Sequence, residues 1–599
     1  MFIARVRSKG KNGKIYESVL LRESFRIGAK VSSRTLAVLT KLPKWLINTI
    51  EAAVNGHGNV RGDDSSDSSI GTSSPAEAIA SLNQAPGSPI AIKQAESFGA
   101  LWLVKSLADK LGIAKAMAPN NCPKAERLDC DDDFSQIALW RVCARVLTPG
   151  ISLLGTTRLA SQTAALRLFS WRESWCEDDL YERHGAWLDK RQSLIEKSLW
   201  RKNHPQPKTS SKSRRSPDED LFLYDVTSSY FEGTTNELSA FGYNRDGKKG
   251  KMQVVMGLLT DGTGDPCAIK VYSGETRDFA TFGDALDQAR KDFGCRHVVM
   301  VGDRGMIKSE QIKAVEGAKG HYISSLTKPQ IQRLLREGVF QIELFDEDLA
   351  EVTDKTTEER YVLRRNPVRQ EEMRVSRRDR QAALEKDVKK AETYLAEHPG
   401  AKVEVQKRKL DARLTKLKLG KWLGIEAEGR TFKIITDEDA QREEEKLDGC
   451  YALRTNLRKD ECGADKVHDR YKALAEVEAD FRTMKTGHLE VRPFFVIKEE
   501  NTRAHALTAM LALKIRRHLA GAWKAENLTV EEGLRQLEAL PILRIEDARG
   551  KTHEILPQPN ELQARLLTAA GVTLPKVVPT TQAAPVVTRK QLPEERKVA

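Results

Sequence analysis

The stretch 221–325 restricts the fold of this chain more than any other part of its sequence. Three short runs rich in β-branched and apolar residues come first, then a helical segment, DFATFGDALDQARKDFG, and then a nearly continuous apolar run, HVVMVGD. Short runs separated by Gly and Asp are typical of strands, and the last run is typical of a central strand buried on both faces. Successive strands followed by a helical crossover predict an α/β fold, a mixed sheet with helices packed on it.

Two carboxylates stand near the ends of these predicted strands. Leu221, Leu223 and Asp225 alternate in LFLYDVTSSYFE, so they share one face of the strand. A carboxylate in line with buried leucines is costly unless a metal or a hydrogen-bond donor satisfies it. Asp303 follows the central apolar run, at the strand end where open α/β sheets place their sites. Each residue also has a plain structural interpretation, as a turn cap for Asp225 and as a helix N-terminal residue for Asp303.

A third carboxylate lies on the helix predicted within VHDRYKALAEVEADFRTMKTG. At about 100° per residue, Tyr471, Glu478 and Lys485 fall close to one line, beside an apolar stripe that must pack on another element. A surface glutamate on a charged helix is the alternative interpretation. Three carboxylates from two strand ends and a helix can hold two divalent cations, and oxygen ligands favour Mg²⁺ or Mn²⁺. Two such ions, ~3.5–4 Å apart, would clamp the attacking and leaving oxygens of a phosphoryl transfer.

These motifs resemble the DD(E) transposases of bacterial insertion sequences, in particular the IS-four superfamily and its IS-sixteen-thirty-four type. The superfamily carries a Tyr-x2-Arg-x3-Glu-x6-Lys signature, which is matched here, with leucine in place of arginine, by Tyr471, Leu474, Glu478 and Lys485. Five segments occur in the family's order over roughly residues 94–520, namely YDVTSSYFEG, FGYNRDGKKGKMQVVMGLL, YSGETRD, VGDRGM and VEADFRTMKTGHLEVRPFFV.

The resemblance implies an RNase H-like catalytic core with two Mg²⁺ or Mn²⁺ ions as cofactor. The implied catalytic metal ligands are Asp225, Asp303 and Glu478. The implied DNA-binding residues are Tyr471, Lys485 and Arg482, with Arg482 or Arg470 supplying the charge that Leu474 lacks.

The implied activity is that of a transposase, which cleaves DNA at the transposon ends and transfers the cut strands to a target. Its implied partners are double-stranded DNA, both the terminal inverted repeats and the target, and a second copy of the chain in a homodimeric synaptic complex. Two alternatives stay open. One is a metal-dependent nuclease of the same fold that does not join strands, and the other is a catalytically inactive DNA-binding relic.

The spacing of the three acids predicts an insertion domain. Asp225 and Asp303 are 78 residues apart, whereas Asp303 and Glu478 are 175 residues apart, more than a bare core needs. We therefore assign residues 327–465 to an insertion between the second and third acids. The resemblance implies a largely β insertion, but the sequence is more typical of helices, including a long charged one near 368–397.

Further candidates for DNA contact each have a structural alternative. The cluster NRDGKKGK contains Arg245, Lys248, Lys249 and Lys251, which either grip phosphates or form a solvated turn. The basic segment 404–421 is likewise either a phosphate contact or a solvated face. Trp422 is either a core residue or an aromatic that stacks a base, and Asp278 in GETRD is interpreted as structural.

Composition is consistent with a nucleic-acid partner. The 599-residue chain carries 98 Lys and Arg against 85 Asp and Glu, a net charge of +13, which favours polyanions. Eight cysteines without a CxxC pair, no signal-like N-terminus and no apolar run of ~18 residues predict a cytoplasmic, nucleoid-associated protein with no membrane contact.

The domain prediction follows these composition changes along the chain. The predicted segments are a small N-terminal β/α region (1–55), a disordered linker (56–92), a helical N-terminal domain that binds DNA (93–200), a linker (201–220), the first part of the core (221–326), the insertion (327–465), the second part of the core (466–525), a C-terminal helical region (526–574) and a flexible tail (575–599).

We expect the linker at 56–92 to be cut first in limited proteolysis. Its Gly, Ser, Asp and Pro content leaves too little apolar surface to offset the entropy of ordering it. Mass spectrometry of early fragments would locate the cuts, and strong amide-exchange protection across the segment would show that the domain boundary is misplaced.

Overall fold

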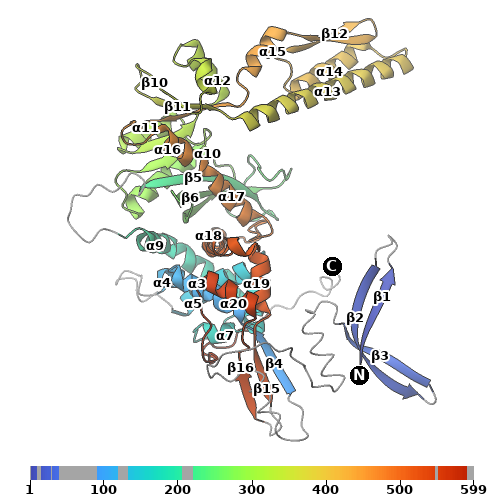
Figure 1. The fold of residues 1–599 in the computed structure, drawn as a ribbon, viewed down its shortest axis with the longest axis vertical. Coiled ribbons are helices and arrows are strands. Elements are labelled where there is room, and N and C mark those ends of the chain that lie inside the picture. The colour runs from blue at the N-terminus through green and yellow to red at the C-terminus, as the bar shows by residue number, and fades with distance from the viewer. Residues whose placement is uncertain are drawn as a thin grey trace, which may run out of the picture. The chain divides into compact units, whose positions relative to one another are not determined.

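The computed structural model forms two compact units, Met1–Ser81 and Leu82–Ala599 (Figure 1). The described residues are 2–9, 15–27, 30–38, 91–118, 132–205, 220–546 and 551–589. The predicted linker at 56–92 lies outside them except for its last two positions, which begin β4 (Ala91–Ser97). Most of the second predicted linker and the last ten residues of the predicted tail, 590–599, also lie outside them.

The smaller unit contains a three-stranded antiparallel sheet in the order β1-β2-β3. Its strands are β1 (Phe2–Lys9), β2 (Ile15–Ile27) and β3 (Lys30–Val38). The sequence pattern predicts a helix from Thr35 onward, which is wrong for residues 35–38, because they pair with β2 as the end of β3. The rest of that predicted helix lies beyond the described residues.

An eight-stranded mixed sheet forms the centre of the larger unit, in the order β10-β11-β14-β9-β8-β5-β6-β7. β5, β6 and β7 run antiparallel to one another in that order, and β8 and β9 continue the sheet on the other side of β5, parallel to it. This is the strand order of an RNase H-like core, so the predicted α/β class is confirmed. The bounds are β5 (Leu221–Tyr230), β6 (Gln253–Asp261), β7 (Pro266–Ser273), β8 (Val299–Val301) and β9 (His321–Ser325).

The two faces of this sheet belong to different hydrophobic clusters. Along β5, Leu221 and Leu223 face one cluster, whereas Phe222 and Tyr224 face the other, as the two-residue period of a strand requires. The first cluster includes side chains of α17 (Leu474–Lys485) and α18 (Glu499–Ala522). The second includes side chains of α10 (Asp278–Asp287) and α11 (Ser309–Gly317). The sheet is therefore covered by helices on both faces.

A helical layer continues the first cluster away from the sheet. Its centre is α18, which is buried along most of its length, and it packs on β7, α5 and α9. The helices here are α3 (Gly99–Lys110), α4 (Ile113–Met117), α5 (Asp132–Leu147), α6 (Leu153–Gln162), α7 (Ala165–Leu168), α8 (Glu177–Asp179), η3 (Leu180–His184), α9 (Gly185–Asn203), η6 (Lys524–Glu526), α19 (Val530–Glu538) and α20 (Glu561–Ala569).

Three segments differ from the sequence prediction. The predicted helical region 526–574 also contains β15 (Pro541–Glu546) and β16 (Thr552–Ile555); β15 pairs with β4 on one side and with β16 on the other. The predicted strand LEVRPFFV makes only an isolated bridge, between Phe494 and Phe231. Within the predicted flexible tail, residues 582–587 hydrogen bond to the backbone at Leu166, Trp171 and Trp175.

The predicted insertion contributes to the sheet and also forms a separate projection. β10 (Ala350–Thr353), β11 (Arg360–Arg365) and β14 (Cys450–Thr455) extend the sheet beyond β9. Before them lie α12 (Lys328–Arg336) and η5 (Ile342–Asp346). The projection, between β11 and β14, consists of α13 (Pro367–Glu397), α14 (Val403–Lys416), β12 (Leu423–Glu428), β13 (Thr431–Thr436) and α15 (Glu438–Glu445).

The projection agrees with the helical character of its sequence, because α13 is a single helix of 31 residues. Trp422 is a core residue there, 6% exposed in the cluster that joins α13, α14 and the β12–β13 hairpin. Across the described ranges, we find no helix with the length and apolar character needed to span a membrane.

Candidate active site

An open cavity of about 800 Å³ lies over the first face of the sheet. Its walls come from β5, the loop between β5 and β6, the turn after β8, α16 (Ala464–Lys472), α17 and the base of the projection. All six residues singled out by the sequence line it, namely Asp225, Asp303, Glu478, Tyr471, Arg482 and Lys485.

The three carboxylates reach the cavity from three different elements. Asp225 continues the alternation of Leu221 and Leu223 on β5, and it is therefore directed to the face that α17 covers. Asp303 follows β8 in a turn whose geometry is fixed by backbone hydrogen bonds of 2.9 and 3.2 Å to its carbonyl oxygen. Glu478 is on the exposed side of α17, whose other side is buried in the first cluster.

The electrostatics at Asp225 indicate that the carboxylates repel one another. Burial and, to a smaller extent, the negative charges of Glu478 and Asp303 raise the pKa of Asp225 to about 6, against the opposing effects of the Val226 backbone N–H and the charge of Arg245. Such a site favours a cation, which would lower this repulsion.

The donor set fits a hard divalent ion, although the side chains are not closed around one. All three candidate ligands are carboxylates, the oxygen donors that Mg²⁺ and Mn²⁺ prefer. In the part of the chain that the structure describes, no three Asp, Glu, His or Cys side chains are gathered as a ready chelating group. Ion binding here would therefore require the carboxylates to draw together.

The Tyr471 hydroxyl contacts the ends of two neighbouring strands, at Ser325 of β9 and at Asp303 just after β8. Its hydroxyl donates to Ser325 Oγ at 2.8 Å and lies 3.5 Å from Asp303 Oδ1. Burial raises the pKa of Tyr471 to about 12, so it remains a neutral donor. The signature spans two helices, since α16 ends at Lys472 and α17 begins at Leu474. Leu474 is 8% exposed and belongs to the hydrophobic cluster.

Lys485 lines the cavity, but its ammonium group is already engaged by the protein. Its Nζ donates to Thr227 Oγ1 at 2.9 Å and to Ser228 O at 2.6 Å, and it lies 2.7 Å from Asp246 Oδ1. Burial lowers the pKa of Lys485, and the contact with Asp246 opposes that shift. The contact with DNA stays a prediction, and it would require Lys485 to leave one of these partners.

Asp246 is a site residue that the sequence analysis missed. Its side chain is 2% exposed, and it accepts from the backbone N–H of Tyr230 at 3.1 Å, from Lys485 and from Arg492. The sequence holds one signal for it, since it is the single acid within the basic cluster NRDGKKGK. Because its two cationic partners, Lys485 and Arg492, are more than 230 residues away, no local pattern marks it.

Other cations of that loop are also paired within the protein. Arg245 forms an ion pair with Asp278, as expected for a structural acid in GETRD, and Lys251 pairs with Glu232. Lys248 lies 5.6 Å from the centre of the Tyr230 ring. The loop is thus held in place at several points.

Arg482 is the better placed of the two arginines considered for the missing signature charge. It is exposed, lines the cavity and has no ion-pair partner among the described residues. Arg470 is only 8% exposed and donates to Cys462 Sγ at 3.2 Å. Arg482 and the exposed Lys472 are therefore available to an anion in the cavity.

Two protein families match the chain. The family described as "Transposase DDE domain" matches residues 216–515, which include all three carboxylates. The fold and the site therefore define a transposase of the DDE class. The family described as "IS1634 family transposase, N-terminal domain" matches residues 3–67. The chain belongs to the DDE transposases of the IS1634 family of insertion sequences.

The other comparisons add little to this assignment. No curated protein matches the chain. Among solved structures, the chain is similar to a piggyBac transposase synaptic complex with hairpin DNA, at 8% identity and a TM-score of 0.32, over 75% of this chain and 82% of that one.

We expect Asp246→Asn to loosen the loop between β5 and β6. The substitution removes the counter-charge of two cations in a buried network, a change that typically costs about 3–5 kcal/mol. Hydrogen exchange with mass spectrometry should show faster exchange in peptides that contain Tyr230 and residues 244–251.

The matched control for this test is Asp278→Asn, because its ion pair with Arg245 is about one third exposed on the Asp278 side. An exposed pair contributes about 0–1 kcal/mol, so little change is expected there. Equal rates of amide hydrogen exchange in the two variants would contradict the role of Asp246 in holding the loop between β5 and β6.

Asp225 should make the protein less stable as pH rises. Its pKa is about 6 in the folded chain against 3.8 ordinarily, so the folded state binds more protons than the unfolded state between these values. Stability from this group falls through that window and stays low above it. In EDTA, Asp225→Asn should be more stable than wild type at about pH 7.5, by about 3 kcal/mol in the free energy of unfolding, and it should melt at a higher temperature. A difference that does not shrink towards about pH 4 would contradict the assignment.

Proposed function

We propose that this protein binds the ends of its insertion sequence, cleaves them and transfers the cut strands to target DNA. The observation that carries the proposal is the meeting of Asp225, Asp303 and Glu478 in one open cavity of a DDE-family chain. Two neighbouring strands and the helix that covers them supply these carboxylates, which is an arrangement suited to phosphoryl transfer.

Each residue of the site has a proposed task. Asp225, Asp303 and Glu478 would hold two Mg²⁺ or Mn²⁺ ions, which neutralise charge on the reacting phosphate and activate the attacking oxygen. Tyr471 fixes α16 to the end of β9 by donating to Ser325 Oγ, and its hydroxyl, 3.5 Å from Asp303 Oδ1, would help to position that carboxylate. Arg482 binds a phosphate of the strand end, since its guanidinium is exposed in the cavity.

Lys485 has a different proposed task from a simple phosphate contact. Its hydrogen bonds to Thr227 and Ser228 hold the part of β5 that directly follows Asp225. Through Asp246 it also fixes the loop that carries Arg245. It therefore positions Asp225, and a contact between Lys485 and DNA would come at the expense of these bonds.

The reaction has two chemically similar steps. In the first, a water oxygen forms a bond to phosphorus and the 3′ oxygen of the transposon strand leaves with a proton. In the second, that 3′ hydroxyl attacks a target phosphodiester, so one ester bond forms as another breaks. We propose a homodimer as the synaptic unit, because two ends must be processed together.

A nuclease that cuts without joining is the main alternative to this proposal. The same carboxylates would serve it, so only the second step separates the two. An assay with pre-cleaved end DNA and a target plasmid decides between them. Joined products support the transposase, whereas hydrolysis without joining would support the nuclease.

Asp225→Ala, Asp303→Ala and Glu478→Ala should each abolish cleavage of end DNA in Mg²⁺ and leave end-DNA binding intact. Each change removes one of three oxygen donors, and loss of any one is expected to prevent productive binding of both ions. Gel assays of cleavage and binding measure the two properties separately. Cleavage within about tenfold of wild type in any variant would remove that residue from the ligand set.

Glu476→Gln is the matched control on the same helix. Glu476 lies two residues before Glu478, but it is paired with Arg517 at 3.1 Å and does not line the cavity. Cleavage should stay near the wild-type rate. As a readout independent of activity, Mg²⁺ should raise the melting temperature of wild type and Glu476→Gln but not of the three alanine variants.

A further inference from the structure

The projection between β11 and β14 is a rigid arm with a core of its own. We call residues 367–445 the arm. Along α13, Leu384, Val388, Ala391 and Leu395 are buried at helical spacing, and they pack with α14 and the β12–β13 hairpin. The first half of α13, residues 367–383, buries no side chain, so it acts as a stalk. Figure 1 shows α13 and α14 leading away from β10 and β11.

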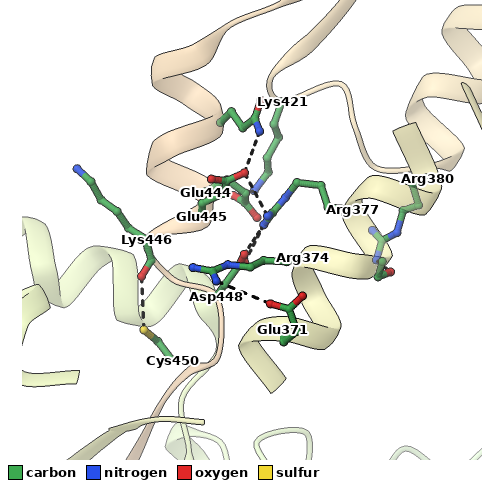
Figure 2. A network of polar contacts seen from close by, with 12 residues as sticks. Glu371, Arg374, Arg377, Arg380, Lys421, Glu444, Glu445, Lys446, Asp448 and Cys450 are labelled. Carbon is green, nitrogen blue, oxygen red and sulfur yellow. Dashed lines mark hydrogen bonds and ion pairs between the residues drawn. The ribbon is translucent and has the colours of Figure 1, made fainter. Parts of the chain in front are cut away.

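A buried polar network fixes the base of the arm to the catalytic unit. Arg377 bonds both oxygens of Asp448, at 2.8 and 2.7 Å, and Asp448 is fully buried (Figure 2). On α15, Glu444 binds Lys421 and Lys328. Arg377 uses Nη2 for Asp448 and Nη1 for Glu445, at 3.3 Å, and these contacts with two carboxylates restrict rotation of the stalk. The direction of the arm is therefore set by the protein before any DNA is bound.

The arm begins at the rim of the catalytic cavity. Asn366, whose side chain caps the first turn of α13, lines the cavity, as does Tyr451 on β14. Asp387 lies 20 residues beyond Pro367, which corresponds to about 30 Å along the helix axis. Because Arg413 bonds Asp387 at 2.8 Å, α14 lies alongside this part of α13, about 30 Å from the rim.

The cations of α14 divide into an inner, paired set and an outer, unpaired set. Lys407 pairs with Asp411 on α14 itself, and Arg413 with Asp387 on α13. By contrast, the α14 stripe, which we define as Arg408, Lys409 and Lys416, is exposed, and within the described ranges none of the three has an ion-pair partner.

The side chains around the α14 stripe also leave space for a large partner to approach the helix. Its three cations fall within about 100° around the helix axis, and the exposed residues among them, Val405 and Ala412, have short side chains. A polyanion could therefore approach the helix closely along the stripe. An unpaired basic stripe along a helix is typical of a surface that binds the phosphates of nucleic acid, and the small residues between these cations leave that surface accessible.

We propose that the α14 stripe binds the phosphates of duplex transposon-end DNA about one helical turn from the bond that is cleaved. The proposal rests on the proposed function, because it requires end DNA in the cavity. A distance of about 30 Å along α13 matches about 9 base pairs of a stiff duplex. The arm would thus contact the end DNA at a fixed distance from the cavity rim.

The test uses the full chain and two end-DNA duplexes. The long one extends about two helical turns from the cleaved bond, and the short one stops about 5 base pairs from it. The variant carries Arg408→Gln, Lys409→Gln and Lys416→Gln together. For the long duplex, the slope of log affinity against log salt should fall in magnitude by about 2.7, because three phosphate contacts are lost. For the short duplex, the variant should equal wild type.

Two controls separate the contact from general charge and from misfolding. The triple swap Arg408→Lys, Lys409→Arg and Lys416→Arg keeps the charges and should keep the slope. The triple variant Lys291→Gln, Lys313→Gln and Lys319→Gln removes three exposed charges on the α10 and α11 side, away from the cavity, and should leave affinity for the long duplex near wild type.

The outcomes distinguish this proposal from the proposed function. If wild type binds neither duplex in a salt-dependent way, the proposed function itself fails. If wild type binds and the α14 variant has the same slope on the long duplex, only the role of the arm is overturned. An equal loss on both duplexes, or normal end binding with loss of strand transfer alone, would also overturn it, the latter in favour of a contact with target DNA.

Discussion

The contact of Asp246 with Lys485 and Arg492 holds the catalytic cavity together. It joins the loop after β5 to the end of α17 and to the segment that follows that helix. Lys485 also bonds the backbone and a side chain of β5 two and three residues beyond Asp225. A carboxylate on a strand and another on a covering helix can stay in register only if strand and helix cannot slide, and this buried network supplies that restraint.

This buried network opposes the electrostatic repulsion among the three carboxylates. Under the proposed function, the same negative charge would bind the metal ions. Asp225 is partly buried and faces the negative charges of Glu478 and Asp303. This arrangement favours a bound cation and destabilises the ion-free site. The apolar packing of both sheet faces and the Asp246 network together hold in place the elements that carry the three acids. Under the proposed function, a bound ion would draw the three side chains together and relieve their repulsion, so the ion-free site carries a cost in stability of the kind that is common at functional sites.

The sequence predicted the elements that follow local rules and missed those that depend on distant partners. Asp225 was found because the two-residue period placed it with Leu221 and Leu223, and Asp303 because it ends an apolar strand. Asp246 was missed because its partners are remote in sequence. β15 and β16 were missed for a related reason, since β15 pairs with β4, which brings residues 541–546 to residues 91–97, and β16 adds to that sheet through β15.

The positive charge available to an anionic partner depends on which Lys and Arg side chains already form ion pairs within the protein. Five Asp or Glu and five Lys or Arg side chains line the cavity, so under the proposed function its attraction for DNA depends on which of these cations are unpaired. Within the loop after β5, Arg245 and Lys251 are paired and add little. Arg482 and Lys472 at the cavity and the unpaired cations of α14 carry charge that the fold leaves uncompensated. Under the proposed function, the placement of these unpaired cations, rather than the net charge of +13, would decide where DNA enters.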